Sequence, residues 1–308
     1  MTQHKTDDYF LGGILIALLG AVCFSTKAIF VKLAYRDTDV DAVTLLALRM
    51  IFALPFFLVS AVASSKKQSN VRFTGRQWLY IAVIGCLGYY ISSLLDFLGL
   101  QYVTAGIERL ILFIYPTLVV LMSSVFFREK IKPIQWIALA VTYVGLLIAF
   151  FGEARLQTGD SANFLLGSVL ILACAFTYAS YIVGSGRLIP SVGASKFNSY
   201  AMSFASIGVL LHFFITSDVA LWHFPATVYY YSFSMAILST VIPSYLITEG
   251  IKRVGSDNVA IVASIGPVST IAMAYFFLDE PVFLAQITGT ILILVGVLLV
   301  SRQKRSVS

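Results

Sequence analysis

Residues 104–132 read TAGIERLILFIYPTLVVLMSSVFFREKIK, an apolar run long enough to cross a bilayer. Two charges, Glu108 and Arg109, lie in its first turns, and Pro116 lies near its middle. A weaker copy follows at residues 256–281, SDNVAIVASIGPVSTIAMAYFFLDEP, which keeps the proline but has neither of the two charges. The prolines of the two stretches, Pro116 and Pro267, are 151 residues apart. This offset indicates a chain that contains two copies of one unit, with buried charge only in the first copy.

The composition is that of a polytopic helical membrane protein. Hydrophobic residues make up 59% of the chain and charged residues 12%, and the mean hydropathy is +0.89. Soluble domains are nearer half apolar and a quarter charged, so the sequence predicts an all-α integral membrane protein. Cys23, Cys86 and Cys174 lie inside apolar runs without paired spacing, which indicates core residues and neither disulfides nor metal ligands. We expect no metal and no cofactor.

Ten segments are long and apolar enough to be transmembrane helices, since each span needs roughly 20 such residues. The predicted spans are 10–34, 43–63, 77–99, 104–127, 133–151, 163–185, 196–216, 227–251, 257–278 and 283–301. The connections are short, and only those at 64–76 and 152–162 exceed ten residues. This leaves no room for a soluble domain.

The positions of Lys and Arg predict the orientation, because cytoplasmic loops carry the excess of these residues. With the N-terminus inside, 15 of the 21 basic residues fall on the inner side, and the outer loops hold only Arg36 and Arg155. Both termini are therefore predicted to be cytoplasmic, and this distribution removes nucleic acid as a partner. Five helices is an odd number, so residues 1–152 and 153–308 form two inverted five-helix repeats, a construction that recurs in secondary transporters.

These features together resemble the drug/metabolite transporter superfamily, specifically chains of two EamA-type domains. The resemblance rests on the duplicated five-helix unit, on proline-centred fourth and ninth helices ending at Glu129 and Glu280, and on glycine-rich fifth and tenth helices around Gly145 and Gly296. It implies a carrier in a bacterial inner membrane that works by alternating access, often exports amino acids or related metabolites, and is commonly driven by protons. It identifies no substrate, because the superfamily also carries sugars, nucleotide sugars and drugs. The two acids are interpreted as structural.

Charged side chains inside predicted spans are the candidate functional residues, because burial in a bilayer is costly and normally demands a partner. The first half holds five such residues: Lys27, Arg49, Asp96, Glu108 and Arg109. At 1.5 Å per residue, all five lie within roughly 5–11 Å of the outer boundary. They predict one polar layer drawn from four helices, for which the second half has no equivalent.

Two interpretations of this layer stay open. In the static one, Asp96 pairs with Arg109 across a short hairpin and Glu108 pairs with Lys27 or Arg49, while Lys27 has the further option of extending to the outer headgroups. In the functional one, a layer of net charge +1 suits a carboxylate-bearing or zwitterionic ligand. Arg109 or Arg49 would then hold the carboxylate, and Glu108 or Asp96 would carry an exchangeable proton.

Aromatic residues, prolines and small residues complete the candidates. The aromatic residues predicted to line a cavity are Tyr89, Tyr90, Phe113, Tyr115, Tyr178 and Tyr181. The prolines that either act as hinges or simply bend helices are Pro116, Pro243 and Pro267. Small residues at four-residue spacing on the first helix, which favour close helix approach, are Gly13, Ala17, Ala21 and Ser25.

Other classes of protein fit less well. The three histidines are scattered and neither HExxH nor GxSxG occurs, so an enzyme is not expected. A channel would need a polar stripe through the full thickness, whereas these charges stop in the outer half. A non-transporting scaffold remains as an alternative, as does a carrier of nucleotide sugars or drugs. The sequence predicts a secondary carrier that exports small polar metabolites, with lipid around it and protons as the candidate coupling ion.

Overall fold

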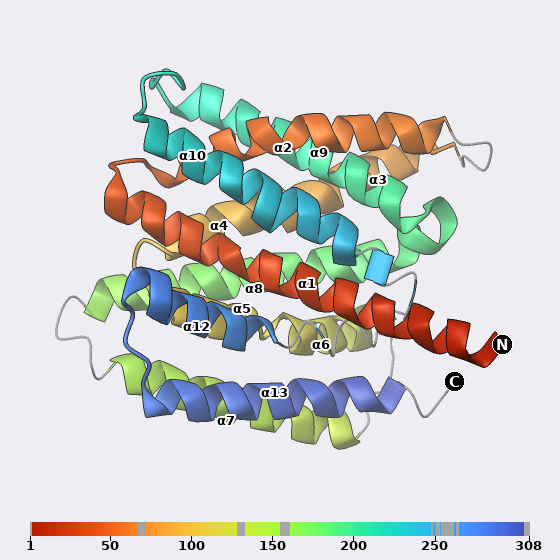
Figure 1. Ribbon diagram of the computed structural model, residues 1–308, viewed down its shortest axis with the longest axis vertical. Helices are drawn as coiled ribbons and strands as arrows, with labels where there is room; N and C mark the ends of the chain where they lie inside the picture. The colour runs from red at the N-terminus through yellow and green to blue at the C-terminus, as the bar shows by residue number, and fades with distance from the viewer. Residues whose placement is uncertain are drawn as a thin grey trace.

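The computed structural model describes residues 2–66, 72–127, 133–154, 161–247, 249–250, 253, 262 and 265–304, and every regular element within these ranges is helical (Figure 1). The elements are α1 Thr2–Asp37, α2 Ala42–Ser65, α3 Gly75–Gly85, η1 Cys86–Ile91, α4 Ser92–Gly99, α5 Ala105–Leu112, α6 Tyr115–Phe127, α7 Pro133–Ala154, α8 Ser161–Val192, α9 Ala194–Thr216, α10 Ala226–Ser234, η2 Met235–Val241, α12 Gly266–Leu278 and α13 Leu284–Lys304.

Seven helices of the described part are long and apolar enough to cross a membrane. They are Tyr9–Asp37, Ala42–Ser65, Gly75–Gly99, Ala105–Phe126, Ala162–Gly186, Ser195–Thr216 and Ala226–Ile247. Shorter apolar helices at Leu139–Gly152, Gly266–Leu278 and Leu284–Gly296 overlap the fifth, ninth and tenth predicted spans. Large apolar side chains such as Ile215 (81% exposed) and Phe276 (75%) face outward, as they do in a protein surrounded by lipid.

The third predicted helix contains a wider, π-helical turn that the sequence does not reveal. A capping box at Thr74 and Gln77 starts α3, and the chain then passes through η1 into α4. Gly88 in η1 lies so close to Tyr181 of α8 that a Cβ would stand 2.3 Å from its ring, so only glycine fits there. A second π-helical segment, η2, precedes Pro243. Such segments are rare in proteins and often lie at functional sites.

The fourth predicted helix is interrupted rather than continuous. Thr104 caps the start of α5, which ends at Leu112, and α6 begins at Tyr115 with Pro116 in its first turn. Pro267 likewise lies in the first turn of α12. A proline costs no helical hydrogen bond at that position, so these two prolines begin helices and do not kink them. The starts of α6 and α12 are 151 residues apart, which is the offset found in the sequence.

Helices from the two halves of the chain interleave. In Figure 1 the start of α1 and the end of α13 lie at the same end of the bundle, and α13 runs alongside α7. A Cβ on Gly145 of α7 would stand 2.8 Å from the carbonyl oxygen of Gly289 of α13, so the two backbones nearly touch. Helix α1 contacts both α12 and η2, and α2 contacts α9. Residues from both halves therefore surround the charged side chains of the first half.

Candidate functional site

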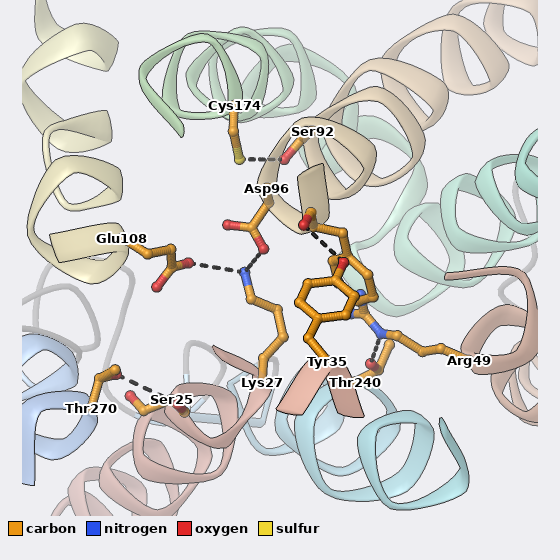
Figure 2. Close-up of polar contacts among 11 residues, drawn as sticks. Ser25, Lys27, Tyr35, Arg49, Ser92, Asp96, Glu108, Cys174, Thr240 and Thr270 are labelled. Atoms are coloured by element: carbon orange, nitrogen blue, oxygen red, sulfur yellow. Dashed lines mark hydrogen bonds and ion pairs between the residues drawn. The ribbon is translucent and has the colours of Figure 1, made fainter. Parts of the chain in front are cut away.

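Lys27 holds two buried carboxylates that come from different helices (Figure 2). Its Nζ, on α1, lies 2.7 Å from Oδ2 of Asp96 on α4 and 3.4 Å from Oε1 of Glu108 on α5. Both carboxylates are 0% exposed, and the lysine side chain is 8% exposed. Asp96 Oδ1 and Glu108 Oε2 have no hydrogen-bond donor within the described residues. With both acids ionised, this triad of Lys27, Asp96 and Glu108 has a net charge of −1 in a site that is almost completely buried.

The observed pairing differs from part of the static interpretation. The predicted pair of Glu108 with Lys27 is confirmed. The predicted pair of Asp96 with Arg109 is wrong, because Asp96 binds Lys27 instead. Extension of Lys27 to the headgroups is also wrong, since its ammonium is buried against the two acids. On the side of α4 and α8, the triad is bordered by Ser92 and Cys174, whose side-chain oxygen and sulfur lie 3.3 Å apart (Figure 2).

Arg49 lies in the same region but has no acidic partner among the described residues. It is 3% exposed, and its Nε donates to Oγ1 of Thr240 in η2 at 2.8 Å. Thr240 in turn donates to the carbonyl oxygen of Met235 at 3.1 Å, and the Arg49 guanidinium lies 5.5 Å from the ring centre of Phe97. Figure 2 shows Tyr35 between Arg49 and Lys27. Arg49 therefore joins α2 to the π-helical segment of the second half.

The Arg109 side chain lies against α1 and α12. Its Nη2 donates to Oγ of Ser25 at 3.4 Å, and its guanidinium lies 5.6 Å from the ring centre of Phe24. A Cβ on Gly266 would stand 2.5 Å from Nη2, so the guanidinium touches the first residue of α12. Ser25 also donates to the carbonyl oxygen of Gly266 at 3.3 Å, and Thr270 donates to that of Ser25 at 3.5 Å.

Four of the five tyrosines predicted to line a cavity come together. The ring centres of Tyr115 and Tyr178 are 5.1 Å apart, those of Tyr178 and Tyr181 are 5.9 Å apart, and those of Tyr181 and Tyr89 are 4.9 Å apart. Tyr89 also donates to Oδ1 of Asn198 at 3.3 Å. These rings form a continuous aromatic row from α6 through α8 to η1. Tyr90 is separate from the row, because its ring faces His212 of α9 at 5.7 Å.

Glu280 fixes the start of the helix that carries Glu108 and Arg109. Its carboxylate accepts the N–H groups of Ala105 at 3.0 Å and Gly106 at 3.4 Å. Burial raises the pKa of Glu280 above its usual value of 4.5, although these N–H groups and Lys32 favour the charged form. The only sequence signal for this contact was the acid at the end of the ninth predicted span. The corresponding acid of the first half, Glu129, lies outside the described residues.

Sequence reasoning missed the uncharged and second-half members of the site. These are Phe24, Thr240, Gly266 and Thr270. One charged residue of the first half was also not included in the predicted layer: Lys32, which donates to the carbonyl oxygens of Leu100 and Val103, just after α4. Ser25 was identified only as a small residue that allows close helix approach. Hydroxyls and a glycine in apolar segments leave no periodic or charge signal, so only the folded arrangement reveals them.

Comparison with known proteins finds a transporter family and transporter relatives along nearly the whole chain. The model of the EamA-like transporter family matches residues 11–151 and 165–302. The uncharacterized transporter YcbK of Bacillus subtilis (strain 168) is 31% identical over 293 residues, which cover 93% of this chain and 91% of YcbK. The uncharacterized inner membrane transporter YicL of Salmonella typhimurium (strain LT2) is 21% identical, with 95% and 96% covered. One crystal structure, 19% identical, superimposes with a TM-score of 0.66 over 96% of this chain and 99% of that one.

Proposed function

The chain belongs to the EamA-like transporter family, and from this premise we propose that it is a secondary active carrier of small polar metabolites. We place it in a bacterial cell membrane, with ten spanning helices in two inverted repeats and both termini cytoplasmic. It works by alternating access and exports its substrate. Two observations support the repeat: the starts of α6 and α12 are separated by the same 151 residues as the two copies in the sequence, and α7 contacts α13 closely.

The observation that carries this proposal is the buried triad. Lys27, Asp96 and Glu108 come from α1, α4 and α5, and a single ammonium serves two carboxylates. A net negative charge in a site of low dielectric is costly, and one added proton removes it. The triad therefore supports proton coupling, in which protons entering the cell drive the export of substrate.

The geometry also supports a route from protonation to movement. The Lys27 ammonium lies nearer to Asp96, at 2.7 Å, than to Glu108, at 3.4 Å. A proton on Glu108 weakens its attraction to Lys27 and leaves the ammonium to Asp96. This loosens α5 from α1, and α5 is a short helix of 8 residues that ends at the break before α6. Protonation thus acts on an element that is already separated from its neighbour.

Purified protein in liposomes provides the test. Vesicles loaded with a pool of polar metabolites are given a pH gradient, and mass spectrometry identifies what leaves them. We expect saturable, gradient-dependent efflux of one class of compound, which Glu108→Gln reduces to the rate seen without a gradient. Efflux that is unchanged in Glu108→Gln would remove the coupling role. Absence of protein-dependent flux for every compound in the pool would favour a non-transporting partner protein.

A further inference from the structure

Arg109 is a buried cation whose charge is not matched by a direct partner. Arg109 is 8% exposed. Both acids of the layer, Asp96 and Glu108, pair with Lys27, and no carboxylate oxygen of the described residues lies within ion-pair distance of the Arg109 guanidinium. The Nε donor of Arg109 has no hydrogen-bond acceptor among the residues that the structure describes. Leaving a buried guanidinium in this state costs free energy that an incoming anion would recover.

The guanidinium of Arg109 lies at the start of a neighbouring helix, α12, which also favours a bound anion. Its Nη2 touches Gly266, the first residue of α12, a helix of 13 residues. The start of a helix carries partial positive charge and N–H groups without helical acceptors. At α12 these N–H groups are those of Gly266 and Val268, because Pro267 has none and Ile265 donates to the carbonyl oxygen of Val262. A guanidinium is repelled there unless a negative group lies between the two. Both features attract an anion to the same place.

The remaining neighbours suit an organic acid. Ser25 offers a hydroxyl beside Nη2, and the ring of Phe24 lies against the guanidinium. The phenols of Tyr115 and Tyr178 are close enough to interact electrostatically with Arg109. The Tyr115–Tyr178 end of the aromatic row described above therefore lies within electrostatic range of this cation. It would contact the rest of a molecule whose negative group rests on the arginine.

We propose that Arg109, Ser25 and the first turn of α12 form a subsite that binds the carboxylate group of the transported substrate. This inference rests on the proposed carrier function and adds the chemical class of its cargo. A carboxylate matches the flat guanidinium with two parallel hydrogen bonds. With both acids ionised, the three bases and two acids of the layer leave a surplus of one positive charge, which a monoanion balances and a phosphate dianion exceeds.

Ligand-dependent melting of the purified full-length protein tests the subsite without a transport assay. The probes are acetate, lactate and benzoate, compared at equal ionic strength with chloride, inorganic phosphate and the neutral amides acetamide and lactamide. A ligand that binds only the folded state raises the melting temperature. We expect at least one of the three carboxylates to do so and its amide, chloride and phosphate not to. Arg109→Gln should weaken that response about 30-fold or more in apparent affinity.

Three further variants keep the result interpretable. Arg253→Gln removes the same charge from an ion pair with Glu249 that is partly exposed, and it should keep the full response. Arg109→Lys retains the charge but loses the two-pronged geometry, so it should respond weakly. Gly266→Ala places a methyl group against Nη2 and should also weaken the response, which provides a second route if Arg109→Gln does not fold.

Several outcomes would overturn the subsite. These are no shift of the wild type by any of the three carboxylates, an equal shift by the matching amide or by phosphate, and a full response in both Arg109→Gln and Gly266→Ala. The liposome experiment separates this failure from failure of the carrier proposal. Flux without carboxylate binding would reject the subsite alone, and carboxylate binding at Arg109 without flux of any compound would reject the carrier alone.

Discussion

Replacing Lys27 with methionine should destabilise the protein strongly, because methionine fills similar space but supplies no charge. Asp96 and Glu108 would remain with 0% exposure and without the ammonium that now lies 2.7 Å and 3.4 Å from them. Removing one partner of a buried ionic group typically costs about 3–5 kcal/mol, mostly as the penalty of the charge left behind. At about 2 °C per kcal/mol for a chain of this size, the melting temperature should fall by about 6–10 °C.

The assay is thermal unfolding of purified Lys27→Met in detergent at pH 8 and at pH 5. Because acid protonates carboxylates that have lost their counter-charge, we expect a smaller decrease at pH 5 than at pH 8. Adding Asp96→Asn and Glu108→Gln to Lys27→Met removes the uncompensated charge and should restore most of the stability. Arg36→Gln, which removes a cation from an exposed pair with Asp37, is the matched control and should change little.

Either of two results would refute this explanation of the stability. If Lys27→Met melted within about 2 °C of the wild type at both pH values, the triad would contribute no net stability. If the decrease persisted in the triple variant, packing of the lysine chain, and not its charge, would explain the effect. Either result would also weaken the case that the triad responds to a single proton.

Three other predictions follow from the structure. Burial raises the pKa of Glu280, so the stability that this group contributes should be fully present below pH 4.5 and be lost as pH rises through the raised value; Glu280→Gln should flatten this part of a melting-versus-pH curve. Gly145→Leu would overfill the α7–α13 contact and lower stability by about 1–3 kcal/mol. Gly186→Ala, which has open space inside helix α8, should instead raise stability by about 0.5–1 kcal/mol in thermal unfolding. Arg49→Gln should raise hydrogen exchange in η2, since Thr240 loses its donor; protection equal to the wild type would contradict that link.

Much of the fold follows from the sequence because long apolar runs allow few structures in a bilayer. The first four predicted spans, and the sixth to eighth, correspond to helices of sufficient length. The interruptions were not visible. A π-helical turn such as η1 leaves hydrophobicity almost unchanged, and Gly88 shows its purpose only when Tyr181 lies against it. Prolines mark breaks in the sequence, but not whether a helix bends or begins there.

The candidate site was predictable in its membership but not in its pairing. Lys27, Asp96 and Glu108 stand out because charge inside an apolar span is costly, and they do meet. Asp96 and Arg109 are close in sequence, which suggested an ion pair. Adjacent residues on a helix, however, project about 100° apart, so Glu108 and Arg109 cannot face the same partner. Glu108 turns toward Lys27, and Arg109 turns toward α12.

The contacts between halves have a consequence for biosynthesis. Ribosomes make the N-terminal half first, so Arg49 enters the membrane well before Thr240 exists, and the N–H groups at the start of α5 wait for Glu280. An arginine in a transmembrane helix adds up to about 2.5–3.5 kcal/mol to the free energy of insertion, the value reached at the helix centre. The nascent charged helices must therefore be held by the insertion machinery, or by one another, until the last segments arrive. A truncated first half would be a poor guide to the finished protein and a ready target for proteolysis.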